Sequence, residues 1–262
     1  MKKWGLVLGS SGSRGSSYIG FIKAFEEAGL RPSYIAGSSM GAVVGACYAS
    51  GMSVEEMIKE AKELKLMQII SFPFSISSIK NGAIFNSTKL IKVLRKYLGD
   101  KTFNDLEIPF CCVATDLYTG ESKTLSGDVD LATAVAASSS IPGIFRPIEL
   151  GESLLVDGGV RCRLPITEVK EMGAKKVVAI DALGDIRPVK KHFNVLSVMF
   201  RTFDIMDSQI TASGNPKENT DMYLRPDLGD MQVYHIKNIE TAIEIGYQEG
   251  KRQVEKLKKL LK

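Results

Sequence analysis

The chain has 262 residues, of which 44% are hydrophobic and 24% are charged, and its formal net charge is +4. This composition is that of an ordinary globular protein and excludes disordered, collagen-like and disulfide-stapled chains. The small positive charge does not indicate a nucleic-acid partner, and four cysteines without a C-x-x-C pair, beside only two histidines, predict no metal site.

The first fifty residues predict a β-α-β unit. Residues 4–8 are expected to form a short buried strand, and residues 16–28 a helix with apolar side chains at helical spacing. A second strand is predicted at 34–36 and a small-residue helix at 42–50. Because a helix between two strands favours parallel pairing, we expect an α/β fold. The expected form is a three-layer sandwich with a mainly parallel central sheet and helices on both faces.

The rest of the chain continues the alternation of helices and strands. Further helices are expected at 53–67, 88–98, 131–138, 167–172, 195–206 and 239–262, and further strands at 109–115, 154–156 and 177–180. The pattern is least regular at 69–84 and weakens again from 183 to 232. No internal repeat or linker divides the sequence, so we expect one domain over residues 1–262.

The amino-terminal segment does not resemble a secretory signal. Its apolar stretch covers only residues 4–8, against the roughly 7–15 residues of a signal peptide. No segment reaches the roughly 18 apolar residues of a transmembrane helix. We therefore expect a cytoplasmic protein that contacts membranes only peripherally.

A G-x-S-x-G motif, Gly37-Ser38-Ser39-Met40-Gly41, lies between a predicted strand and a predicted helix. In this context the motif forms a sharp turn that exposes its central serine at the carboxyl end of the strand. Ser39 would then lie at the positive end of the following helix, with the amide of Met40 directed toward an oxyanion. Ser39 is the predicted nucleophile, and the alternative is a purely structural turn.

A nucleophilic serine requires a base, and the sequence offers two. His235 lies downstream in a polar stretch that carries no motif. Asp157 ends a predicted strand and is followed by Gly158 and Gly159, which let neighbouring backbone approach closely. Because an Asp-Gly-Gly sequence also forms ordinary turns, these patterns alone leave the choice open.

The loop of residues 9–15 is rich in glycine and serine. It lacks the G-x-G-x-x-G of dinucleotide-binding proteins and the Gly-Lys-Ser/Thr of a P-loop. We expect an anion cradle instead, in which the amides near residues 11–13 and the start of the first helix face an oxyanion.

Four motifs occur together in the order and spacing of the patatin-like phospholipases. They lie at residues 6–20, 37–42, 136–145 and 157–159, so they span about residues 1–180. The sequence resembles this family, which implies a serine lipid acyl hydrolase with a Ser–Asp dyad, no catalytic histidine and no cofactor. The nucleophile then corresponds to Ser39 and the base to Asp157. The implied oxyanion hole is the backbone around three loop residues with an arginine nearby: Ser11, Gly12, Ser13 and Arg14.

The sequence departs from the pattern of the family in two places. Ser10 and Ser11 stand where the glycine loop usually has glycines, and Cys162 stands where an Asn is common. A side chain would be strained wherever the loop requires a positive φ.

Two other functions are compatible with the sequence. One is an esterase of the α/β-hydrolase type with a Ser39–Asp–His235 triad. The other is a lipid- or acyl-chain-binding protein whose serine-substituted loop does not catalyse.

Two segments could contact lipid. Residues 66–79 are apolar and are either a cap over the site or ordinary core or dimer contact. Residues 251–262 hold six Lys or Arg against the single Glu255. Such a helix either lies on an anionic membrane or packs on the protein with its basic face in solvent.

Overall fold

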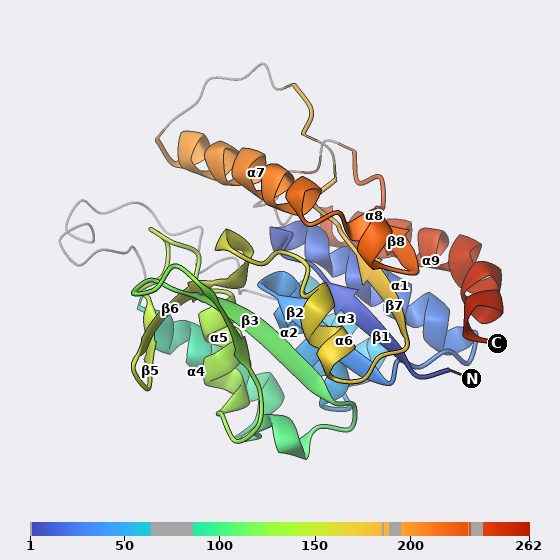
Figure 1. The fold of residues 1–262 in the computed structure, drawn as a ribbon, viewed down its shortest axis with the longest axis horizontal. Helices are drawn as coiled ribbons and strands as arrows, with labels where there is room; N and C mark the ends of the chain where they lie inside the picture. The colour runs from blue at the N-terminus through green and yellow to red at the C-terminus, as the bar shows by residue number, and fades with distance from the viewer. Residues whose placement is uncertain (1, 64–85, 185, 189–194, 230, 232–237) are drawn as a thin grey trace.

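The computed structural model describes residues 2–63, 86–184, 186–188, 195–229, 231 and 238–262 (Figure 1). Eight strands form one sheet of order β5-β6-β3-β2-β1-β7-β8, with β4 paired to β3 as well. The strands are Trp4–Leu8 (β1), Tyr34–Ser38 (β2), Phe110–Asp116 (β3), Ser122–Leu125 (β4), Ile148–Leu150 (β5), Ser153–Asp157 (β6), Lys176–Ile180 (β7) and Met222–Leu224 (β8).

Helices precede and follow most of these strands. The α-helices are Ser17–Glu27 (α1), Met40–Ala49 (α2), Val54–Glu63 (α3), Ser87–Leu98 (α4), Leu131–Ser138 (α5), Ile166–Glu171 (α6), Val195–Ser213 (α7), Pro216–Asn219 (α8) and Ile239–Leu261 (α9). Short 3₁₀ turns are Gly12–Ser16 (η1), Phe103–Asp105 (η4) and Gly158–Val160 (η5).

The centre of the sheet is parallel and one side of it is antiparallel. Strand β1 pairs in parallel with β2 and β7, β2 with β3, and β7 with β8. Strands β4 and β6 run antiparallel to β3, and β5 runs antiparallel to β6. The prediction of a mainly parallel sheet is therefore confirmed.

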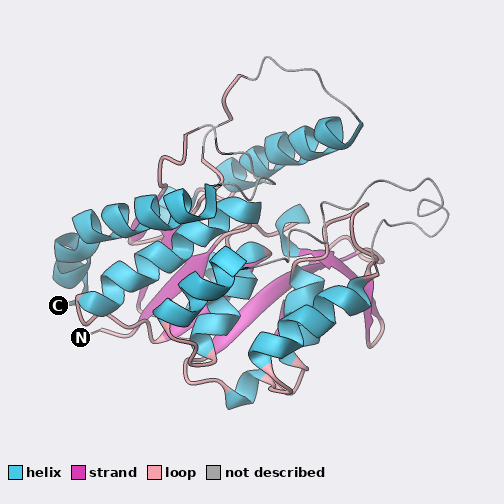
Figure 2. Ribbon diagram, turned by 180° about the vertical axis from the view of Figure 1, so that it is seen from behind, coloured by secondary structure: helices cyan, strands magenta, loops and turns pink. Residues whose placement is uncertain are grey.

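Alternate residues of the central strand enter two different cores, because successive side chains of a strand point to opposite faces. Leu6 and Leu8 belong to the larger core, to which α1, α2, α4, α5 and α9 contribute. Val7 belongs to the smaller core, where it meets Ile166 and Val169 of α6. Figure 2 shows the larger set of helices in front of the strands, and Figure 1 shows α6 on the other face. Helices on both faces confirm the three-layer sandwich.

The last helix, α9, packs along α1. Leu257 and Leu261, which would enter a membrane if the helix lay on one, are fully buried within the protein. Lys251 and Lys259 are exposed. The helix therefore follows the packed alternative, and contact of its basic face with anionic lipid stays a prediction. None of the helices in the described ranges is long and apolar enough to span a bilayer.

The structure departs from the sequence predictions mainly at short elements. Strands β4, β5 and β8 were not predicted, and each has only three or four residues. Helix α7 continues to Ser213, beyond the expected end at 206. The glycine loop runs into the 3₁₀ turn η1, in which Ser13, Gly15 and Ser16 are buried. The predicted cap at 66–79 and the alternative base His235 lie outside the described residues.

Candidate active site

Ser39 occupies a strained turn between β2 and α2. Its φ is 53° and its ψ is −121°, and in the described part of the chain only Asn215 is another non-glycine residue with positive φ. The start of α2 also nearly touches the neighbouring strand β1. A Cβ on Gly41 would lie 2.0 Å from the carbonyl oxygen of Leu8, so no side chain fits there. This geometry presents the hydroxyl of Ser39 at the carboxyl end of the strand.

Two serines at the carboxyl end of α5 hold the turn in place. The amide of Ser39 donates to Oγ of Ser138 at 3.0 Å, and Oγ of Ser139 donates to the carbonyl oxygen of Ser39 at 3.2 Å. Both serines lie in the motif at residues 136–145. Their hydrogen bonds satisfy the backbone of a residue whose conformation lies outside regular structure.

Asp157 reaches Ser39 because two strands end at neighbouring residues of β3. Ser38 of β2 pairs with Val113, and Asp157 of β6 pairs with Ala114. Since β4 pairs with both Val113 and Ala114 along the opposite edge, β2 and β6 share one edge of β3 and approach each other from opposite directions. The ends of both strands therefore meet, although 118 residues separate Ser39 from Asp157.

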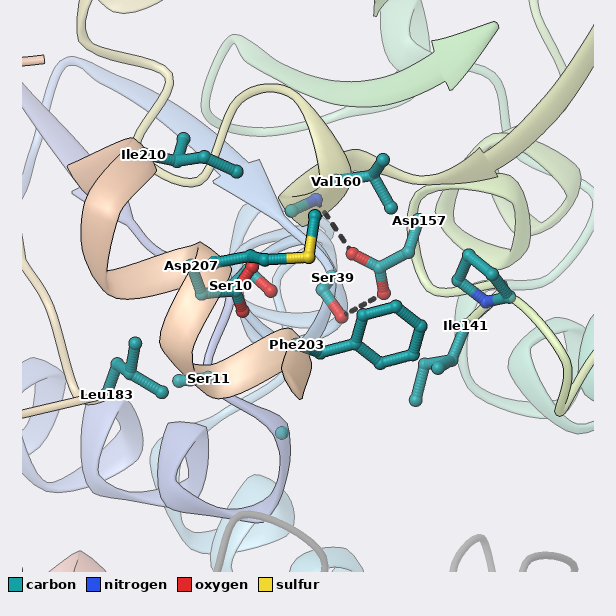
Figure 3. A pocket seen from close by; sticks show the side chains of 14 residues that line it. Ser10, Ser11, Ser39, Ile141, Asp157, Val160, Leu183, Phe203, Asp207 and Ile210 are labelled. Carbon is teal, nitrogen blue, oxygen red and sulfur yellow. Dashed lines mark hydrogen bonds between the residues drawn. The ribbon is translucent and has the colours of Figure 1, made fainter. Parts of the chain in front are cut away.

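The two side chains are joined directly. Oγ of Ser39 donates a hydrogen bond to Oδ2 of Asp157 at 2.6 Å, and the amide of Gly159 donates to Oδ1 at 2.7 Å (Figure 3). Both Ser39 and Asp157 are 6% exposed. Burial raises the pKa of Asp157 to about 6, against the opposing effects of these two hydrogen bonds and of the charge on Arg163.

The glycine loop borders the same cavity without the expected strain. Ser10, Ser11 and Gly12 line the cavity together with Ser39 and Asp157. Only Gly12 of these loop residues has a positive φ, of 54°, and φ of Ser11 is −160°, which any residue adopts. Ser10 and Ser11 therefore do not stand at positions that require a positive φ, and the strain expected of a side chain at such a position does not arise there.

The other residues predicted for the oxyanion hole lie elsewhere. The guanidinium of Arg14 donates to the carbonyl oxygens of Met231, at 2.6 Å, and Leu183, so it braces the loop from outside the cavity. The side chains of Ser13 and Met40 line a different cavity on the far side of the turn. The backbone of Met40 still begins α2 directly after Ser39.

Helix α7 closes over the cavity, a role that the sequence did not indicate. Phe203, Met206, Asp207 and Ile210 line it, and the cavity volume is about 70 Å³ (Figure 3). Burial raises the pKa of Asp207 to about 7, opposed by the charge of Arg163 and assisted by the carboxylate of Asp157. No motif surrounds Asp207, and its only signal in the sequence is an acid on a helix of mixed polarity.

Arg163 links the cavity to the surrounding elements, and it too was missed. Its side chain is fully buried and donates to the carbonyl oxygen of Ser10 and to Oγ1 of Thr211 on α7. It forms ion pairs with Asp181, at 3.2 Å, and with Asp207, at 3.6 Å. One guanidinium thus connects the glycine loop, the end of β7 and α7.

Comparison with known proteins identifies the family. The model of the patatin-like phospholipases matches residues 6–170, which is more than half of the chain. The chain belongs to the patatin-like phospholipase family. The members of this family are serine lipid hydrolases, and the resemblance inferred from the four motifs is confirmed.

Individual patatin-like relatives support the same grouping. An uncharacterised NTE family protein of Mycobacterium tuberculosis is 37% identical over 180 residues, covering 68% of this chain and 49% of that protein. The human patatin-like phospholipase domain-containing protein 6 is 34% identical over 184 residues, covering 67% of this chain and 13% of that protein. The chain thus spans about half the length of the mycobacterial relative.

Solved structures share the patatin-like fold. VipD from Legionella pneumophila matches with a TM-score of 0.59 at 17% identity, covering 98% of this chain and 67% of that one. ExoU from the type III secretion system of Pseudomonas aeruginosa matches with a TM-score of 0.57 at 15% identity, covering 99% and 53%. At these identities the likeness concerns the fold alone.

Proposed function

We propose that this chain hydrolyses carboxylic esters of lipids through a catalytic dyad of Ser39 and Asp157. The observation that carries the proposal is the 2.6 Å hydrogen bond from Ser39 Oγ to Asp157 Oδ2 at a buried cavity. A serine hydroxyl is a weak nucleophile at neutral pH and needs an adjacent base. Here the base is in direct contact with the hydroxyl.

The reaction proceeds in two acyl-transfer steps. Asp157 accepts the proton of Ser39 Oγ as that oxygen bonds to the ester carbonyl carbon. Amides of the glycine loop and of Met40 stabilise the oxyanion of the tetrahedral intermediate. The intermediate expels the alkoxide, which takes the proton from Asp157, and the acyl group remains on Ser39. Water then attacks the acyl-enzyme while Asp157 takes its proton, and collapse returns a proton to Ser39 and releases the acid.

The raised pKa of Asp157 supports its role as base. A carboxylate of ordinary pKa, 3.8, accepts a proton poorly from an attacking hydroxyl, whereas one near 6 accepts it better and is still ionised at neutral pH. Burial beside the cavity is the main cause of the shift, so the same enclosure that positions Asp157 also tunes it.

The direct contact between Ser39 and Asp157 favours a dyad over a triad. In a Ser-His-Asp triad the imidazole stands between the two side chains. A separation of 2.6 Å leaves no room for one. We therefore expect His235→Ala to retain the hydrolysis of p-nitrophenyl butyrate. Loss of activity in that variant would instead favour the triad.

Labelling with a fluorophosphonate tests the nucleophile. Wild-type protein should be labelled at Ser39, as mapped by peptide mass spectrometry, and Ser39→Ala should lose both labelling and the hydrolysis of p-nitrophenyl butyrate. Ser50→Ala is the matched control, because the hydroxyl of Ser50 donates to the carbonyl oxygen of Cys47 at the end of α2 and Ser50 does not line the cavity. Labelling that persists in Ser39→Ala contradicts the proposal. Lipid binding without any labelling would identify a non-catalytic lipid-binding protein.

A further inference from the structure

A second cavity lies on the other side of the turn that carries Ser39. Its walls are mainly the facing sides of three helices, α2, α3 and α4, and residues of η1, α1 and α9 complete them. Most of the lining side chains are apolar, including Val43 on α2, Met57 and Ala61 on α3, and Leu94 on α4. On α2 the lining residues recur at helical spacing from Met40 onward, so one face of the helix that begins at the nucleophile is turned into this cavity.

Only a thin partition separates this apolar cavity from the cavity that Ser39 and Asp157 line, which is called the catalytic cavity below. A Cβ on Gly15 would lie 2.5 Å from Cγ of Met40 and 2.8 Å from Oγ of Ser11. Met40 lines the apolar cavity, and Ser11 lines the catalytic cavity. Because Gly15 has no side chain, Met40 from one cavity and Ser11 from the other can both pack against it. The side chain of Met40, which follows Ser39 directly, stands at this boundary.

The polar groups at the edge of the apolar cavity are already paired. Oγ of Ser16 donates to the carbonyl oxygen of Ser13 at 2.8 Å. Burial and a hydrogen bond with Glu60 raise the pKa of Tyr97 to about 12, and burial raises the pKa of the Cys47 thiol to about 12 as well, so both are neutral. The carboxylate of Glu60, which also lines the cavity, is engaged by the hydroxyl of Tyr97, and most of the other lining groups are apolar. The cavity therefore suits an alkyl chain better than a polar or charged ligand.

We propose that this cavity receives the acyl chain of the ester and that Met40 is its movable partition, an inference that rests on the proposed function. An acyl group on Ser39 Oγ begins one residue away from Met40, whose unbranched side chain has three rotatable bonds and adapts readily to a neighbour. The catalytic cavity contains Asp157 and Asp207 and takes the alcohol part of the ester. The substrate class is then esters with a medium or long alkyl chain.

The preference for chain length tests this assignment. Each methylene buried on binding contributes on the order of fourfold to kcat/KM. Wild-type protein should therefore prefer p-nitrophenyl dodecanoate to the butyrate. Val43→Phe and Ala61→Leu fill the cavity and should lower the dodecanoate-to-butyrate ratio by about tenfold or more. Met57→Ala enlarges the cavity and should raise that ratio.

A matched substitution and a binding measurement separate this inference from the proposed function. Val254→Phe places the same change on a half-buried valine of α9, roughly four turns from the cavity-lining Ile239, and should keep the wild-type ratio. In a Ser39→Ala background, the filling substitutions should weaken the binding of a fluorescent long-chain fatty acid about tenfold. Thermal melts check the folding of each variant.

The possible results lead to different conclusions. If both esters lose activity equally in Val43→Phe and Ala61→Leu, and fatty-acid binding does not change, the acyl-chain assignment is overturned while the dyad stands. If Ser39→Ala still hydrolyses the butyrate, the dyad fails, and the fatty-acid measurement still decides whether the cavity binds an alkyl chain.

Discussion

The catalytic cavity and the apolar cavity lie on two sides of one turn, and they contain different kinds of buried group. On the catalytic side the cavity is lined by Asp157 and Asp207, and the fully buried Arg163 forms ion pairs with Asp207 and with Asp181. The apolar cavity is lined by aliphatic and methionine side chains, with a neutral thiol at Cys47.

The two kinds of buried group have opposite effects on the stability of the fold. A buried charge costs free energy unless a partner of opposite charge and hydrogen bonds compensate it. The buried charges on the catalytic side therefore lower the stability of the fold. The packed apolar faces of α2, α3 and α4 raise it. Ser39 lies on the turn between the two sides, so it is held by the packed helix α2 and faces the buried charges.

The largest expected effect follows from removing the base. Asp157→Asn keeps the shape of the side chain but cannot accept a proton from Ser39, so kcat should fall on the order of 10²–10⁴-fold. Butyrate and dodecanoate esters should lose activity equally, because the base serves every acyl chain. A change in the ratio of the two esters would contradict the separation of the two cavities.

The same variant should be more stable than wild-type protein at neutral pH. The folded-state pKa of Asp157, about 6, lies above the ordinary value of 3.8, so the folded protein holds this proton to a higher pH than the unfolded chain does. The free energy of unfolding therefore falls as the pH rises from about 4 to 6, by up to about 3 kcal/mol. Asp157→Asn should escape this loss above pH 6, and the difference should vanish below pH 4, as measured by urea unfolding.

Asp116→Asn provides a control of opposite sign for that measurement. The carboxylate of Asp116, at the end of β3, accepts hydrogen bonds from the amides of Tyr118 and Leu154. The bond from Tyr118 is the main cause that lowers the pKa of Asp116. The substitution should therefore destabilise the protein at neutral pH. If both variants were stabilised, the account of Asp157 would be wrong.

A smaller effect on turnover, but a clear one on stability, is expected at Arg163. Arg163→Met leaves Asp181 buried without its main partner, which should cost about 3–5 kcal/mol in the free energy of unfolding. Arg163→Lys keeps the charge but cannot reach Ser10, Asp181 and Thr211 at once, so its kcat should fall for both esters alike.

Arg225 offers the matched comparison. It faces the same carboxylate, Asp181, at 3.8 Å, but its side chain is 33% exposed. Arg225→Met should therefore cost less than about 1 kcal/mol in urea unfolding. Equal losses in Arg163→Met and Arg225→Met would show that burial of Arg163 does not set the cost.

The central elements could be predicted because their signals are local. Residues 4–8 and 34–36 are short apolar runs bounded by turn residues, and the G-x-S-x-G motif fixes the turn between β2 and α2. Strands β5 and β8 have three residues each and exist through pairing with strands distant in sequence. Such pairing leaves no periodicity for a sequence to reveal.

The candidate site shows the same contrast between residues with a local signal and residues placed by tertiary contacts. Ser39 has a motif of its own, whereas the meeting of Ser39 and Asp157 depends on the edge of β3 that β2 and β6 share. Arg163 could not be predicted to be buried, because arginines are rarely fully buried unless they are paired, and its partners come from three separate elements. The closure of α7 over the cavity is equally a matter of tertiary contacts.

The smallest expected effect concerns Asp207. In wild-type protein kcat/KM should fall about tenfold per pH unit below pH 6, as Asp157 takes up a proton. Burial raises the pKa of Asp207 to about 7, so most of its charge is already lost at pH 6, and the carboxylate of Asp157 adds to this rise because the two charges repel each other. Asp207→Asn removes the remainder of its charge and should move the midpoint of the acid limb down by about a few tenths of a pH unit.

Asp204→Asn makes the same change one turn earlier on α7, at a residue that does not line the cavity, and should leave the midpoint where it is. An upward shift in Asp207→Asn would mean that this side chain stabilises the ionised form of Asp157. Asp157 and Asp207 would then be coupled through the hydrogen bonds of the groups around Arg163, and repulsion between their two charges would not be the dominant effect.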